Sequence, residues 1–112
     1  MPTRTELASR VMVRMGVLDA GENPTPKEAN DVIDVMNSVY LSLKERGRIH
    51  WSLDAIPTQF IDPFINVVAD RASPDFGIND ATLNQRAQLG LKEIFALSAR
   101  DYDGRADEVV DF

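Results

Sequence analysis

Cysteine is missing from this chain of 112 residues, and histidine and tryptophan each occur once. Without cysteine the chain forms neither a disulfide framework nor a zinc-thiolate site. The composition is therefore compatible with a reducing compartment. A single histidine also leaves few ways to build a nucleophile, a base and an activating group into one catalytic site.

Long apolar runs are missing as well. No apolar stretch approaches the roughly 18 residues that a membrane span needs. Arg4 and Glu6 interrupt the region where a signal peptide needs continuous apolar residues. We therefore expect a soluble chain with no membrane contact and no export signal of its own.

Basic residues are outnumbered, with 12 lysines and arginines against 18 acids and a formal net charge of −6. An extended contact with a phosphate backbone needs clustered lysine and arginine, so we expect no sequence-specific binding of nucleic acid. Solubility is the ordinary reason for such acidity in a small domain.

The hydrophobic pattern predicts an all-α, four-helix bundle-like domain over residues 1–102, followed by a C-terminal tail over residues 103–112. Helices are expected at residues 5–15, 26–46, 58–72 and from about residue 80 to Tyr102. The second is the most strongly patterned, because seven apolar residues fall on one helical face. These residues are Ala29, Val32, Ile33, Met36, Val39, Tyr40 and Leu43.

Local signals mark the ends of the first two helices. Thr3 with Glu6, and Thr25 with Glu28, have the spacing of capping boxes. Gly16 and Gly47 follow the apolar-periodic segments, where a left-handed residue ends a helix.

Two features concern the later helices. Pro63 is best tolerated in a first helical turn, which favours Asp62 as the N-cap of the third helix, while an earlier start with a kink at Pro63 stays open. Asn79 or Asp80 can cap the fourth helix. Ala87 and Gly90 are small, so another helix can approach closely there.

Between the second and third helices the apolar period changes to two. Ile49, Trp51 and Leu53 alternate with polar residues, which indicates a short half-buried strand or an extended arm. A single strand needs a partner, so these three residues are candidates for an intersubunit arm. The alternative is an extended connection in which Trp51 packs on the bundle of its own chain.

Catalytic and metal-binding residues are hard to assemble from this sequence. A triad would need His50 with Ser52 and Asp54 of the same short segment, which is too local for the usual geometry. Glu28, Asp31 and Asp34 share one polar face of the second helix, and a solvated face is the simpler interpretation than a two-carboxylate glycosidase site. We expect that the chain is not an enzyme, that it has no catalytic or metal site and that it needs no cofactor.

The C-terminal tail combines a polar stretch with an apolar end. Residues 103–108 are mostly charged, whereas Val109, Val110 and Phe112 are apolar. This pattern is typical of a segment that docks on a partner, and the alternative is an ordinary frayed end.

Several short motifs occur in an order that resembles a known family. Gly16-Val17-Leu18 follows the first helix, Gly21-Glu22-Asn23-Pro24 precedes the second, and Tyr40 lies near the end of the second. Residues 72–77 read Ala-Ser-Pro-Asp-Phe-Gly. The chain thereby resembles the head-to-tail adaptors of tailed bacteriophages, also called connectors or tail accessory factors, of the packaged-DNA-stabilisation type in podoviruses.

The resemblance implies a structural role in the virion. Such a chain forms a ring, expected to be a dodecamer, between the portal protein and the tail or nozzle proteins, where it seals the DNA channel. It would be made in the cytoplasm of the bacterial host and would let DNA pass without gripping it. The family places a portal-gripping arm at its C-terminus, so Val109, Val110 and Phe112 are expected to contact the portal or a neighbouring subunit. The alternative is a helical interaction domain or small enzyme unrelated to phage assembly.

Overall fold

In the computed structural model, the backbone is described for residues 2–109 and the side chains for residues 2–99. The helices are α1 (Arg4–Met15), α2 (Pro26–Glu45), α3 (Thr58–Ala72) and α4 (Ala81–Val109), with a short 3-10 helix, η1 (Ser73–Phe76), between α3 and α4. Residues 2–109 contain no strand. The predicted all-α, four-helix single domain is confirmed.

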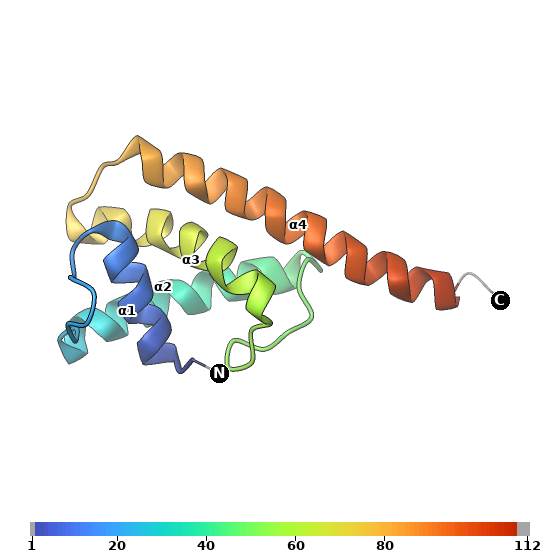
Figure 1. Cartoon of the computed structure of the whole chain (residues 1–112), viewed down its shortest axis with the longest axis horizontal. Helices are drawn as coiled ribbons and strands as arrows, with labels where there is room; N and C mark the ends of the chain where they lie inside the picture. Colours follow the sequence, from blue (N-terminus) through green and yellow to red (C-terminus); the bar gives the residue numbers. More distant parts are fainter. Residues whose placement is uncertain (1, 110–112) are drawn as a thin grey trace.

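Helix α3 is the centre of the domain. It packs against α1, α2 and α4, and α1 also packs against α2 (Figure 1). A helix that is enclosed by neighbours needs apolar residues around most of its circumference. The buried side chains of α3 meet this need: Phe60, Pro63, Phe64, Ile65, Val67, Val68, Ala69 and Ala72.

The ends of α1 and α2 form as their local signals predict. In each capping box the threonine Oγ1 accepts a hydrogen bond from the backbone N–H three residues later, at 3.1 Å for Thr3 and Glu6 and at 3.2 Å for Thr25 and Glu28. Each glutamate in turn accepts from the backbone N–H of its threonine. These reciprocal bonds satisfy donors that a helix start otherwise leaves unpaired.

The predicted apolar face of α2 packs into the core. Five of its seven residues are buried, and Ile33 and Tyr40 are partly buried against the same cluster. Met36 and Val32 are fully enclosed. The register predicted for α2 is therefore confirmed.

Helix α3 starts before Asp62, which is the earlier start left open above and not the start favoured from the sequence. The helix begins at Thr58 after Pro57, and Pro63 lies inside it, so Asp62 is not the N-cap. The extra turn places Phe60 in the core, where 1% of its surface is exposed. Burial of a phenylalanine offsets the backbone hydrogen bond that Pro63 cannot donate.

Helix α4 approaches α3 closely at Gly90, as the small residues there predicted. A Cβ atom at residue 90 would lie 2.7 Å from the carbonyl oxygen of Pro63. Asp80 is the cap, because its Oδ1 accepts a hydrogen bond from the N–H of Thr82 at 2.9 Å.

Helix α4 is longer than the sequence suggested. Its helical backbone continues past Tyr102 to Val109, which corrects the expected end of the helix and the start of the extended tail. Residues 105–108 tolerate helical structure, and a single Gly104 costs only about 1 kcal/mol. Val110 and Phe112 lie outside the described residues, as does the side chain of Val109. In Figure 1 the last turns of α4 extend beyond the other helices.

Candidate interaction surfaces

The connection between α2 and α3, residues 46–57, is built into the chain's own core. Ile49 and Leu53 are each 3% exposed, and Ile56 is 5% exposed. The connection has turns and bends and no strand. Its alternating pattern therefore reflects apolar side chains that point into the bundle, and the intersubunit arm proposed from Ile49 and Leu53 is replaced by an intramolecular connection.

Trp51 packs this connection onto α2 and α3. Its ring centroid lies 5.8 Å from that of Tyr40, 5.5 Å from that of Phe60 and 5.6 Å from that of Phe64. The Tyr40 hydroxyl donates to the Trp51 carbonyl oxygen at 3.0 Å. Among the described residues, the Trp51 indole nitrogen is buried with no hydrogen-bond partner. Unpaired buried donors are unfavourable, so packing and not hydrogen bonding holds the indole in place.

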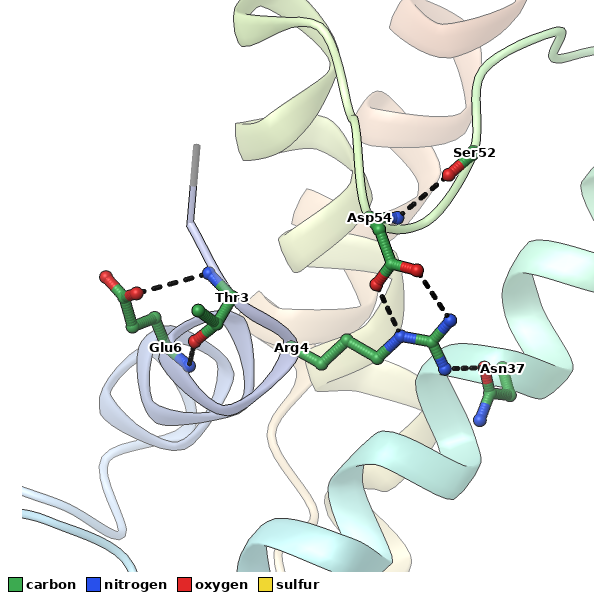
Figure 2. A network of polar contacts seen from close by, with 6 residues as sticks. All are labelled: Thr3, Arg4, Glu6, Asn37, Ser52 and Asp54. Atoms are coloured by element: carbon green, nitrogen blue, oxygen red, sulfur yellow. Dashed lines mark hydrogen bonds and ion pairs between the residues drawn. The ribbon is translucent and has the colours of Figure 1, made fainter.

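A polar clamp fastens the same connection from outside (Figure 2). Arg4 of α1 donates to Asp54 from Nε at 2.7 Å and from Nη2 at 3.1 Å. Its Nη1 also donates to Asn37 of α2 at 3.4 Å. The hydrogen bond from Arg4 lowers the pKa of Asp54, and the same bond raises the pKa of Arg4. One arginine thus joins α1, α2 and the connection.

The clamp also decides whether His50, Ser52 and Asp54 can form the triad considered from the sequence. Asp54 pairs with Arg4, and its backbone N–H donates to the Ser52 Oγ at 3.1 Å. His50 is exposed on the surface. The three residues are therefore not arranged as a nucleophile, base and orienting acid.

The carboxylates of α2 separate into two roles. Glu28 belongs to the capping box, and the hydrogen bond from the Thr25 backbone lowers its pKa. Asp31 and Asp34 instead line a hollow of about 620 Å³ together with Arg71 and Asp75. The sequence indicated the acidic face of α2, but only the packing of α3 and η1 brings Arg71 and Asp75 to it. In the described part of the chain, no group of three or more His, Cys, Asp or Glu is placed to hold a metal ion.

A second hollow, of about 140 Å³, lies between α2, α3 and α4. Val39, Leu43 and Val67 form its apolar base, while Ser42 and Leu91 lie beside them. Arg46 and Arg71 complete this hollow. Because Arg71 also lines the acidic hollow, the two lie side by side along α2.

A third hollow, of about 330 Å³, separates α1 from the loop before α2 and includes Arg10, Val13 and Glu22. Arg14 on its wall pairs with Asp62 at 3.4 Å and donates to Asn66. Through these two contacts Arg14 joins α1 to α3.

No family model, curated protein or solved structure matches this chain. None of the described helices combines the length and apolar character of a membrane-crossing segment. The interpretation of its function therefore depends on the sequence motifs and on the surfaces described above.

Proposed function

We propose that this chain is a structural head-to-tail adaptor of a tailed bacteriophage, which forms a ring beneath the portal, seals the DNA channel and supports the tail. Its partners would be the portal protein, the tail or nozzle proteins and further copies of itself, in a dodecamer as in the resembled family. The ring would be part of the virion.

The observation that carries the proposal is the position of the motifs in the fold. Gly16 closes α1 in the left-handed region, with φ of 81°. The Gly21-Glu22-Asn23-Pro24 segment lies in the loop that leads into α2. The Ala-Ser-Pro-Asp-Phe-Gly segment contains the 3-10 helix η1 (Ser73–Phe76) between α3 and α4, and Gly77 ends it with φ of 70°. Three of the motifs therefore lie at junctions between helices, and this arrangement supports the proposal.

The surfaces favour an assembly role over a catalytic one. Asp54 and Ser52 of the triad candidates are engaged in the connection and its clamp, and Asp31 and Asp34 lie in an open hollow. Helix α4 extends beyond the bundle and gives one chain the reach to contact another (Figure 1).

Association with portal rings tests the proposal. The full chain is mixed with purified portal rings of the same phage, sedimented and imaged by electron microscopy. We expect co-sedimentation and ring-shaped density on one face of the portal. An unrelated acidic helical protein of similar size gives the background. A chain that stays monomeric or dimeric and leaves the portal bare would contradict the proposal and favour an unrelated interaction domain or small enzyme.

A further inference from the structure

Helix α4 packs on α3, and two contacts define the register between these helices. Gly90 approaches the Pro63 carbonyl oxygen, where a Cβ atom at residue 90 would lie only 2.7 Å away. Earlier in α4, the side-chain amide of Asn84 donates a hydrogen bond to the Asp70 carboxylate at 3.3 Å. Going back along α4 therefore corresponds to going forward along α3 by a nearly equal number of residues. The two helices are antiparallel.

Helix α4 is too long for α3 to support all of it. The antiparallel register places residue 95 near Thr58, where α3 begins. Residues 96–109, which we call the α4 overhang, continue the helix beyond this point for about 21 Å, at about 1.5 Å per residue. Figure 1 shows this end of α4 extending past the other helices. Packing on α3 therefore does not by itself fix the direction of the overhang.

Arg48, in the connection between α2 and α3, contacts α4 where the overhang starts. Its carbonyl oxygen accepts a hydrogen bond from the Ser98 hydroxyl. Its guanidinium carbon lies 4.7 Å from the centroid of the Phe95 ring, which is a cation–π contact. Phe95 and Ser98 are three residues apart, so they lie on the same side of α4. Among the described side chains of α4, that of Ser98 is the last buried one, with 8% of the residue exposed.

The length of α4 makes its far end sensitive to this contact. Ser98 lies about 12 Å along the helix from Gly90, and residue 108 lies about 27 Å from it. If α4 turns about its close contact with Pro63, residue 108 moves about twice as far as Ser98. Ile94, in the core, lies halfway between Gly90 and Ser98 and moves only half as far as Ser98. A small change at Ser98 therefore becomes a larger change at the end of the overhang.

We propose that Arg48 is a latch that sets the direction in which the α4 overhang leaves the bundle. The latch consists of the two contacts of Arg48, with Phe95 and with Ser98. When both contacts are lost, α4 turns about the backbone contact between Gly90 and Pro63, and the overhang moves away from the C-terminal end of α2. The inference does not depend on the proposed adaptor function, because all of these contacts lie within one chain.

Distances between spin labels test the latch in the purified chain. The natural chain has no cysteine, so labels attach only at introduced cysteines. Glu45→Cys provides a reference on α2, and it is paired in turn with Gln85→Cys, Ala99→Cys and Glu108→Cys on α4. Residues 45, 85 and 99 are exposed, and the backbone of residue 108 is helical. Pulsed electron paramagnetic resonance then gives one distance distribution for each pair.

The latch variant combines Arg48→Ala with Ser98→Ala. A turn of α4 by about 10° should move residue 108 by about 5 Å, residue 99 by about half as much and residue 85 least. We therefore expect the largest increase or broadening for the 45–108 pair. Arg48→Lys keeps a cation over Phe95 and should retain the distances of the natural chain.

A matched control removes one cation–π contact and one side-chain hydrogen bond elsewhere. Lys44 lies over the Tyr40 ring at 5.6 Å within α2, and Gln88 donates to Asn84 at 3.0 Å within α4. Lys44→Ala with Gln88→Ala should therefore leave all three distances unchanged.

Circular dichroism establishes that each variant keeps its helical content, and Ser98→Ala alone replaces the double variant if that one unfolds. An unchanged 45–108 distance in the latch variant would overturn the proposal. Equal changes for the 45–85 and 45–108 pairs would also overturn it, because α4 would then have separated from α3 as a whole.

Discussion

The two connections that flank α2 are held in place by different forces. The first, residues 16–25, is fixed at its ends by backbone geometry. Gly16 donates to the carbonyl oxygens of Met12 and Val13, and Thr25 exchanges hydrogen bonds with Glu28. Residues 19–23 between these ends are exposed.

The second connection, residues 46–57, is fixed along its length by tertiary contacts. Ile49, Leu53 and Ile56 are buried, Trp51 packs on aromatic rings of α2 and α3, and Asp54 is clamped by Arg4. Both segments connect two helices, but local interactions hold the first connection and long-range interactions hold the second. Substitutions in the two connections should therefore differ in their effect on stability.

The largest expected difference comes from a buried charge. Leu53 is 3% exposed, so Leu53→Asp places an unpaired carboxylate in the core. This change should lower the free energy of unfolding by more than about 3 kcal/mol. Leu18→Asp is the matched change in the first connection, where the leucine is only partly buried, and should cost about 1 kcal/mol. Urea denaturation followed by circular dichroism measures both. Equal losses would show that the two connections contribute alike.

A smaller loss should follow from removing the aromatic side chain of the second connection. Trp51→Ala deletes the packing against Tyr40, Phe60 and Phe64 and should cost about 3 kcal/mol in the free energy of unfolding. The same urea titration measures this loss.

Trp51→Phe is the informative control for that loss. It keeps an aromatic ring and removes the indole N–H that is buried without a partner, so the change in unfolding free energy should stay within about 1 kcal/mol. If phenylalanine proved as damaging as alanine, the indole nitrogen would have to make a stabilising contact.

The same division between local and long-range interactions governs what the sequence could reveal. Capping boxes, terminal glycines and the apolar face of α2 are local features, so the ends of α1 and the register of α2 were predictable. The close approach at Gly90 was predictable too, because a residue without a side chain, placed between large apolar residues on a helix, leaves room for a neighbouring backbone.

Features that depend on distant residues were not predictable in this way. Alternation at Ile49, Trp51 and Leu53 is equally compatible with a strand and with a connection that packs on the helices of its own chain. Burial of Phe60 decided the start of α3 against the local signal at Asp62. Likewise, nothing near Asp31 in the sequence indicates that Arg71 and Asp75 complete its hollow.

A modest effect is expected at the local end of the first connection. Thr25→Ala removes the acceptor for the Glu28 N–H and should cost about 1 kcal/mol, measured by thermal unfolding. Thr25→Ser keeps a hydroxyl and should restore most of the stability. A Thr25→Ala variant as stable as the natural chain would indicate that the loop is held by contacts other than its capping box.

The smallest difference should appear in how stability depends on pH and salt, because an acid with a lowered pKa forms a hydrogen bond in each connection. For Asp54 the cause is the hydrogen bond from Arg4, and for Glu28 it is the hydrogen bond from the Thr25 backbone. A folded-state pKa below the unfolded value stabilises the fold above the unfolded pKa, and this contribution is lost as the pH falls through the folded pKa. Asp54→Asn and Glu28→Gln should therefore each be less stable than the natural chain near neutral pH, and each difference should shrink towards zero in strong acid.

Added salt should affect the contributions of Asp54 and Glu28 to stability differently. Added salt should reduce the loss of stability caused by Asp54→Asn more than the loss caused by Glu28→Gln. Salt screens the exposed ion pair of Asp54 with Arg4, whereas it has less effect on the short hydrogen bonds between Glu28 and Thr25. Urea midpoints at neutral and acidic pH, each with low and high salt, measure the four cases. The acid of the first capping box, Glu6, has its pKa lowered by Thr3 and stays unchanged in both variants, so it cancels from the comparison. Identical salt responses would mean that the clamp acts through its hydrogen bonds alone and that the two connections do not differ in their use of charge.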